Sequence, residues 1–152
     1  MRLSLSITIL SILFICGSYS NPIVESASVS EFVLTIHVKN IRNKKGRIQF
    51  QVYRSQTTFA AENPWKQAYS SKANVKDKSL TFKIHGLKAG VYGIALLDDE
   101  DSDKKMDYSW LVPSEGFGFS GYYHTAWSKP KFHQFKFSMS ANKKVSVKVR
   151  YM

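Results

Sequence analysis

Apolar and polar residues alternate along much of the chain, with the two-residue period of strands that bury one face. The runs with this period cover residues 32–38, 48–52, 80–84, 133–139 and 145–151. The first two are separated by the turn-like sequence Asn43-Lys44-Lys45-Gly46, so we expect them to pair as a hairpin. Residues 91–97 are almost continuously apolar, which predicts a central strand covered on both faces.

This pattern predicts an all-β fold. Short strands separated by turns, without a long helical period, favour a single antiparallel β-sandwich of about seven strands, either transthyretin-like or immunoglobulin-like. Residues 57–63 favour one helical turn, which Pro64 would end. A segment of over 30 residues, from Asp98 to about Lys131, lacks the alternation and is expected to be one long acidic and aromatic loop. Such a loop inside a compact domain is usually functional.

The N-terminus has the pattern of a secretion signal. Met1-Arg2 supplies a positive charge, an apolar segment runs from Leu3 to Cys16, and small residues precede Asn21. The apolar segment is about 14 residues long, which is short for a membrane span. We therefore expect a protein exported to the periplasm or the extracellular medium, with no transmembrane span in its mature form. The expected division is a signal peptide at 1–20, a flexible tether at 21–30 and a β-sandwich domain at 31–152.

Cys16 is the only cysteine and lies inside the expected signal, so the mature domain would have neither a disulfide nor thiol chemistry. Alternatively, Cys16 accepts a lipid and the protein is a lipoprotein. Leu13 before it and Gly17-Ser18 after it fit that alternative. Ile15 fits poorly, because the residue before a lipidated cysteine is usually small.

The net charge of +11 narrows the expected partners. A basic exported protein favours anionic polymers, lipopolysaccharide or acidic membrane surfaces. The expected partner is an unknown envelope or extracellular ligand, with an anionic polymer or a saccharide as the candidates. The lysines are spread over the alternating strands, and the sequence has neither a basic helix nor an arginine-rich run. We therefore do not expect nucleic-acid binding.

The long loop opens with a concentration of acid: residues 98–107 hold six of the chain's 11 carboxylates. Asp99, Asp101 and Asp103 stand at positions 1, 3 and 5 of a calcium-loop spacing, and Asp107 stands at position 9. The backbone carbonyl of Lys105 would be the ligand at position 7. Because Ca²⁺ takes six to eight oxygen ligands, this spacing predicts a calcium site that pins the loop.

Two positions depart from that spacing. Position 6 is Lys104 where a Gly usually permits the sharp turn, and position 12 is Trp110 where a bidentate Glu usually closes the site. The alternative is a solvated acidic turn, with aspartates that cap backbone amides and are neutralised by Lys104 and Lys105. Both interpretations stand at the level of sequence.

An aromatic segment with interleaved glycines follows the acid. Its rings can form a platform that stacks on sugars or other flat groups, with Glu115 as a polar partner. The alternative, which we favour for Trp110, Phe117 and Phe119, is that the rings fold the loop back onto the sandwich and are buried. The candidate ligand-binding residues are Trp110, Glu115, Phe117, Phe119, Tyr122 and Tyr123.

Catalytic signatures are weak, so we expect a binding or envelope-structural module and name no catalytic residue. No Ser lies in a Gly-x-Ser-x-Gly elbow, and His124 and His133 lack metal-ligand spacing. The alternative function is a small exported hydrolase that acts on saccharides through two opposed loop carboxylates, for which Asp107 and Glu115 are available.

Three segments together resemble domain-of-unknown-function family 2141: Gly90 to Leu97, Asp99 to Asp107, and Pro113 to Ser120. The corresponding family signature is an apolar strand, an "HDENGNGKLD"-like loop and a "PKEGYGFS"-like segment. The resemblance extends over about residues 31–151 and implies an exported bacterial protein of this size, without implying an activity. The chain departs from the family at Asp98, where the family has His, and at Lys104, where the family has Gly.

Overall fold

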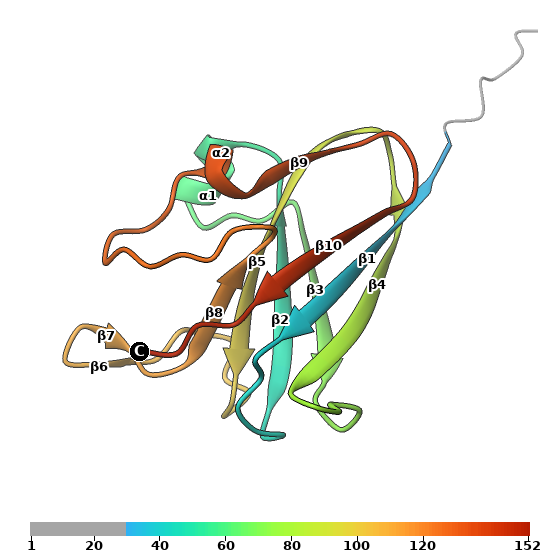
Figure 1. Cartoon of the computed structure of the whole chain (residues 1–152). Helices are drawn as coiled ribbons and strands as arrows, with labels where there is room; N and C mark the ends of the chain where they lie inside the picture. The colour runs from blue at the N-terminus through green and yellow to red at the C-terminus, as the bar shows by residue number, and fades with distance from the viewer. Residues whose placement is uncertain (1–29) are drawn as a thin grey trace, which may run out of the picture.

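Two β-sheets pack face to face in this protein, as Figure 1 shows. The computed structural model describes residues 30–152, so the expected signal peptide, Cys16 and the tether up to residue 29 lie outside the described residues. One sheet has three strands and the other has five, and a two-stranded ribbon stands apart from both. The predicted all-β sandwich is therefore confirmed as an architecture.

The three-stranded sheet has the order β10-β1-β4, with the first strand of the domain at its centre. β1 is antiparallel to β4 but parallel to β10, so the sandwich is not wholly antiparallel as the sequence pattern predicted. The strands are β1 (Phe32–Lys39), β4 (Ser79–Leu87) and β10 (Lys143–Lys148).

The five-stranded sheet has β5 at its centre, and β5 is buried along nearly its whole length, as predicted. One edge of β5 pairs with β2, which in turn pairs with β3; the other edge pairs with β9 near its start and with β8 near its end. The strands are β2 (Arg47–Tyr53), β3 (Lys66–Ser71), β5 (Gly90–Asp99), β8 (Gly116–Phe119) and β9 (Lys136–Met139).

The main core lies between the sheets, where the alternating apolar residues meet; Leu34, Phe50 and Ile94 are each 0% exposed. A second, aromatic cluster contains Phe119 of β8 together with rings from α1 (Gln56–Ala60) and α2 (Phe132–Phe135). The part of the chain from residue 30 onward has no helix long and apolar enough to cross a bilayer.

The predicted hairpin between the first two strands is wrong. β2 pairs with β3 and β5 rather than with β1, because the connection at residues 40–46 carries the chain from one sheet to the other. Asn40 adopts a left-handed φ of 67°, and Ile41 is buried at the crossing. Alternation identifies the buried face of a strand but not its partner.

The segment expected to be one long loop contains three strands. These are β6 (Tyr108–Ser109), β7 (Val112–Pro113) and β8, which joins the larger sheet. Two further differences from the prediction lie outside this segment. The strand β3 was not predicted, and α2 occupies the start of the strand that was expected from residue 133. Within the described residues, the two facing sheets together have eight strands, three in one and five in the other, close to the predicted number of about seven.

Candidate metal centre

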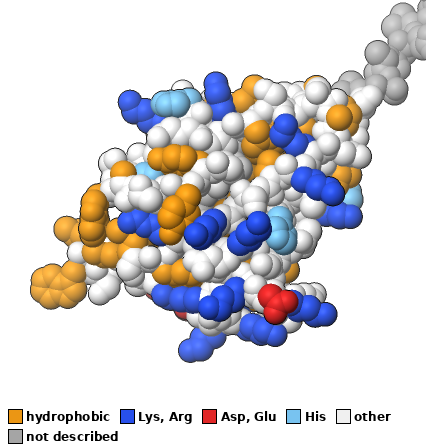
Figure 2. All heavy atoms as spheres, viewed as in Figure 1, with side chains coloured by type: hydrophobic (Ala, Val, Ile, Leu, Met, Phe, Trp, Pro, Cys, Tyr) orange, Lys and Arg blue, Asp and Glu red, His pale blue; other side chains and the backbone are white. Residues whose placement is uncertain are grey.

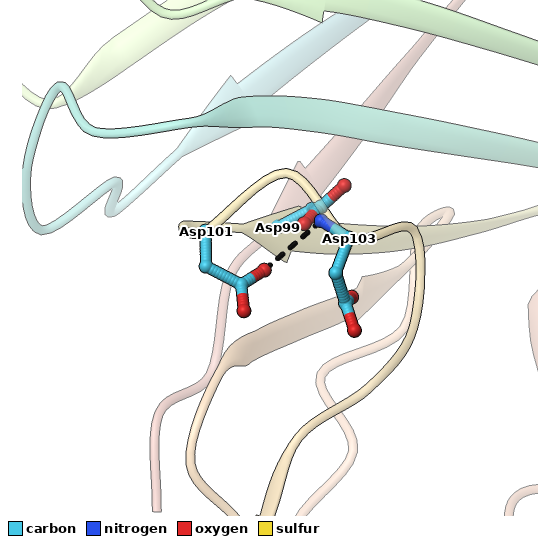
Figure 3. Close-up of side chains that lie close together, drawn as sticks. All are labelled: Asp99, Asp101 and Asp103. Atoms are coloured by element: carbon cyan, nitrogen blue, oxygen red, sulfur yellow. Dashed lines mark hydrogen bonds between the residues drawn. The ribbon is translucent and has the colours of Figure 1, made fainter.

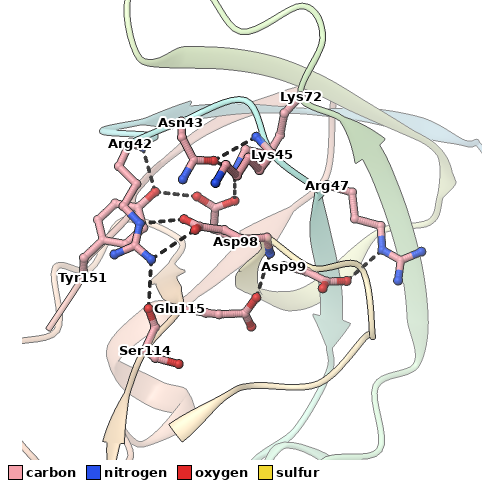
Figure 4. A network of polar contacts seen from close by, with 11 residues as sticks. Arg42, Asn43, Lys45, Arg47, Lys72, Asp98, Asp99, Ser114, Glu115 and Tyr151 are labelled. Atoms are coloured by element: carbon pink, nitrogen blue, oxygen red, sulfur yellow. Dashed lines mark hydrogen bonds and ion pairs between the residues drawn. The ribbon is translucent and has the colours of Figure 1, made fainter. Parts of the chain in front are cut away.

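A buried network of polar side chains fixes the end of β5, where the acidic loop begins (Figure 4). Asp98 is fully buried, and its Oδ1 accepts a hydrogen bond of 2.5 Å from Lys72 Nζ. Lys72 Nζ also donates to Asn43 Oδ1 at 3.0 Å, and the Tyr151 hydroxyl donates to Asp98 Oδ2 at 2.5 Å. Burial raises the pKa of the Asp98 carboxyl, although the hydrogen bonds from Lys72 and Tyr151 oppose that shift.

The next two carboxylates bind arginines from neighbouring segments. Arg42 donates two hydrogen bonds to the Glu100 carboxylate, of 2.6 Å from Nε and 3.1 Å from Nη2. The Arg42 guanidinium also lies 4.5 Å from the centre of the Tyr151 ring. Arg47 Nε donates to Asp99 Oδ2 at 2.7 Å. Asp98, Asp99 and Glu100 therefore each have a basic partner, and these ion pairs hold the start of the loop in place.

Asp99 also belongs to a group of five carboxylates that we call the carboxylate cluster: Asp99, Asp101, Asp103, Asp107 and Glu115. Figure 3 shows Asp99, Asp101 and Asp103, which offer oxygens within 4.8 Å of one another. Asp101, Asp107 and Glu115 form a second such group, so Asp101 is common to both. All four aspartates that the sequence predicted as metal ligands are brought together.

Two oxygens of the cluster are buried without a hydrogen-bond partner. These are Asp99 Oδ1 and Glu115 Oε2, from side chains in residues that are 0% and 4% exposed. The other Glu115 oxygen accepts a 2.7 Å hydrogen bond from the Glu100 amide. Burying a charged oxygen without a partner is costly, so such atoms usually mark a bound ion or water. Each group of three carboxylates contains one of them.

The electrostatics of the cluster are unbalanced. Burial raises the pKa of the Glu115 carboxyl, the charges of Asp99 and Asp101 raise it further, and the hydrogen bond from the Glu100 amide opposes the shift. Within residues 30–152, no ion pair to a basic side chain involves Asp101, Asp103, Asp107 or Glu115. The cluster therefore has excess negative charge that a cation would offset.

The backbone turns sharply at Lys104 although this residue is not glycine. Lys104 has φ +75° and Ser102 has φ +70°, both in the left-handed region. The Lys104 amide donates to Asp99 Oδ2 at 3.2 Å. The departure from Gly at this position therefore does not prevent the loop geometry, although it leaves a lysine in a conformation that glycine adopts more readily.

Some of the capping expected for a solvated acidic turn is also present. The Asp103 amide donates to Asp101 Oδ1 at 3.0 Å, and the Lys105 amide donates to Asp103 Oδ1 at 2.7 Å. These bonds use one oxygen of each of the two aspartates. The use of the Lys105 carbonyl as a ligand stays a prediction.

Sequence reasoning missed Glu115 as a candidate metal ligand and grouped it with the aromatic residues. The register of the larger sheet explains its place: Gly116 of β8 pairs with Asp98 of β5, so the residue before Gly116 lies beside the start of the acidic loop. Gly116 itself has no room for a Cβ, which would lie 2.3 Å from the Tyr151 ring. The available signal was the acid that directly precedes a glycine-rich apolar strand.

The predicted aromatic ligand residues do not form one platform. Phe119 is buried and Phe117 and Tyr122 are half-buried, all three near His124, whereas Tyr123 is 46% exposed. Burial was the expectation for Phe117 and Phe119, and it holds fully only for Phe119. The same expectation for Trp110 is wrong, since this residue is 97% exposed on the turn between β6 and β7.

Two hollows of the surface lie elsewhere. One, of about 650 Å³, is lined by basic side chains that include Arg54, Lys131 and Lys136. The other, of about 420 Å³, lies beside the connection that contains Arg42 and Asn43. Neither hollow includes Asp107 or Glu115, the two carboxylates considered for a saccharide hydrolase.

Comparison with known protein families matches residues 36–148 to the family described as "Uncharacterized protein conserved in bacteria (DUF2141)". No curated protein and no solved structure matches the chain.

Proposed function

Because the chain belongs to the DUF2141 family of uncharacterised bacterial proteins, whose description names no activity, we propose a function from the carboxylate cluster itself. The protein is an exported β-sandwich that binds one calcium ion between β5 and β8. The ion orders the connecting loop, and the ordered loop serves a binding or envelope-structural role rather than catalysis.

The observation that carries the proposal is the pair of buried, unpartnered oxygens, Asp99 Oδ1 and Glu115 Oε2. A cation held by either group of carboxylates would give the buried oxygen of that group a partner, and Asp101 belongs to both groups. It would also offset the repulsion that contributes to the raised pKa of Glu115.

The donor set favours Ca²⁺ over other metals. All side-chain ligands are carboxylate oxygens, with neither His nor Cys in the cluster, which suits hard cations rather than zinc or copper. Five carboxylates, some of them bidentate, with the Lys105 carbonyl can supply the six to eight oxygens that Ca²⁺ takes. Mg²⁺ demands a regular octahedron and usually keeps several waters on one or two carboxylates, so it suits this crowded cluster less well.

Thermal unfolding with excess Ca²⁺ and with a chelator tests the proposal. A ligand that binds only the native state at about 100 times its Kd adds roughly 2.7 kcal/mol to the free energy of unfolding. We expect a rise of several degrees in the midpoint for the natural protein, and none for Asp101→Asn, which removes the carboxylate common to both groups.

Asp77→Asn is the matched control, because Asp77 is an exposed aspartate in another turn with a left-handed φ of 48°. This variant should keep the full calcium response. An equal midpoint in millimolar calcium and in chelator for the natural protein would refute the proposed function.

Export is supported by the sequence pattern of residues 1–20. Intact mass measurement after expression of the whole chain in a bacterium distinguishes the two processed forms. A chain that begins at Asn21 supports a cleaved signal, and a diacylated chain that begins at Cys16 supports the lipoprotein alternative. An unprocessed chain retained in the cytoplasm would contradict export.

A further inference from the structure

The ribbon of β6 and β7 ends in a turn that exposes two large apolar side chains. Ser109 pairs with Val112, so Trp110 and Leu111 form a two-residue turn. They are 97% and 94% exposed. Figure 1 shows this ribbon extending from one corner of the molecule, away from both sheets. The turn is therefore a convex apolar tip, whereas ligand pockets are concave.

The backbone of this turn makes the choice of residues unusual. Trp110 has φ +51° and Leu111 has φ +68°, as at the two central positions of a type I′ turn. Such positions favour Asn and Gly, because a bulky side chain is strained at positive φ. The sequence places two bulky apolar residues where the local geometry favours small ones, and strain of this kind clusters at functional sites.

The surroundings of the tip are mixed apolar and basic. Figure 2 shows hydrophobic side chains projecting at the corner where Figure 1 places β6 and β7, with Lys and Arg side chains over the adjoining surface. Tyr108 at the base of the ribbon is 65% exposed, and Lys104 and Lys105 are exposed just before it. The whole chain has a net charge of +11.

We propose that the β6–β7 tip docks on an anionic lipid surface, with Trp110 and Leu111 entering the boundary between headgroups and acyl chains. Trp is enriched at that boundary, since its ring is apolar and its N–H stays hydrated. Basic side chains near the surface add attraction to anionic headgroups. A protruding apolar tip on a basic molecule matches the chemistry of such a surface, whereas a single Trp beside a Leu offers a sugar little flat area.

The docking depends on calcium, and in this respect it rests on the proposed function. Asp107 directly precedes Tyr108, and it belongs to the cluster with Asp101 and Glu115 at the base of the ribbon. Without a cation, these unpaired carboxylates repel anionic headgroups. A bound Ca²⁺ offsets that repulsion and fixes the base of the ribbon, so that the tip is presented in one orientation.

The test is sedimentation with vesicles of phosphatidylcholine alone and of phosphatidylcholine with phosphatidylglycerol, each in calcium and in chelator. The variant is Trp110→Asn with Leu111→Gly, which removes both apolar side chains but gives the turn the residues that its geometry favours. It should fold at least as stably as the natural protein. The matched control is Val91→Ser, which removes an apolar side chain, 40% exposed, at the opposite end of β5.

We expect the natural protein and Val91→Ser to bind the anionic vesicles in calcium, with affinity lowered at least tenfold by chelator and by the tip variant. Calcium binding without vesicles, followed by the thermal midpoint, should be unchanged in the tip variant. If the midpoint shows calcium binding but the natural protein fails to sediment, or the tip variant sediments as well as the natural protein, the docking inference is wrong while the proposed function stands. A saccharide or protein partner would give that outcome.

Discussion

At the scale of the residue, Lys104 combines a left-handed φ of +75° with a positive charge beside the carboxylate cluster. A left-handed conformation costs a residue other than glycine roughly 1–2 kcal/mol. We predict that Lys104→Gly raises calcium affinity about tenfold, because about 1.4 kcal/mol corresponds to a factor of ten. Isothermal titration of both proteins with calcium measures the change.

Lys105→Gln is the control for that prediction. It removes the same charge from the neighbouring position, and Lys105 has no left-handed φ. The gain that Lys104→Gly shows over Lys105→Gln is therefore the conformational part. Equal affinities for these two variants would mean that charge alone accounts for the effect, and a loss of affinity in Lys104→Gly would contradict the prediction.

The raised pKa of Glu115 predicts a pH dependence with a definite sign. The folded protein holds this proton at a higher pH than the unfolded chain does. Without calcium, its contribution to stability therefore falls as pH rises from the ordinary glutamate range through the raised pKa. Calcium needs the ionised carboxylate, so calcium affinity falls as pH drops through the same window.

Glu115→Gln checks this assignment. The amide cannot ionise, so this component of the calcium-free pH dependence, which extends upward from the ordinary glutamate pKa of about 4.3, should disappear from thermal unfolding. The calcium response should disappear with it. An unchanged calcium-free pH profile would place the titrating group elsewhere.

Spacing alone predicted four of the clustered carboxylates, because residues 99–107 form one local turn in which alternate side chains converge. The spacing of acidic residues within the loop could not predict that Glu115 joins them. It reaches the cluster through the pairing of β8 with β5, which is a property of the sheet and not of the loop sequence. The predicted burial of Trp110 is wrong for a different reason. Composition suggests burial of a large ring, but the two-residue turn leaves this side chain in solvent.

At the scale of the element, the ion pair of Lys72 with Asp98 joins the segment after β3 to the end of β5. Both side chains are fully buried. Lys72→Met leaves the Asp98 carboxylate buried with only Tyr151 and should cost about 3–5 kcal/mol. Urea unfolding measures the cost.

The double variant Lys72→Met with Asp98→Leu removes both charges and should recover a large part of that loss, since paired burial contributes little net stability. If Asp98→Leu lowers the stability of the Lys72→Met variant by as much as it lowers that of the natural protein, the two charges do not interact. The cycle also separates the pair from the hydrogen bond that Tyr151 donates to Asp98.

Gly46, in the connection between β1 and β2, lies against the backbone that begins the acidic loop. A Cβ there would lie 2.0 Å from the Asp99 carbonyl oxygen. Gly46→Ala should lower stability by more than about 2 kcal/mol, through both strain and overpacking. It should also weaken calcium binding, because the Asp99 backbone must shift.

Gly121→Ala is the matched control in urea unfolding. Gly121 has the same φ of +64°, but a Cβ there would have nothing within 4 Å. It should show only the conformational cost, of roughly 1–2 kcal/mol. Equal losses in the two variants would rule out the steric conflict at Asp99.

The alternating runs predicted β1, β2, β4 and β10 as strands and their buried faces, because a two-residue period reports which side chains avoid water. They did not predict which strands pair. β1 lies between β4 and β10, both distant in sequence, and β2 lies in the opposite sheet. The strand β3 was not predicted because it lies at the sheet edge. Its exposed positions include polar Lys66 and Gln67, so its sequence has no clear alternation.

At the scale of the whole molecule, calcium should order one region and leave the rest unchanged. β5 is central and buried, so its amides should exchange slowly with or without the ion. We predict that calcium slows hydrogen exchange at residues 100–115 by ordering them locally, whereas β1, β4 and β10 slow only by as much as the rise in global stability allows. Mass spectrometry of peptide exchange measures this, and the absence of any slowing at residues 100–115 would contradict the local role.

The parallel pairing of β1 with β10 also determines the order in which the chain can fold. Val33 and Asn142, which are hydrogen-bonded at the start of these strands, are 109 positions apart. One edge of β1 therefore stays open until the last strand has left the ribosome, and pairings of such long range form slowly. The smaller sheet therefore closes only after β10 has been made. Late closure of this sheet suits the export that we propose, in which the chain passes through a translocation channel before it folds.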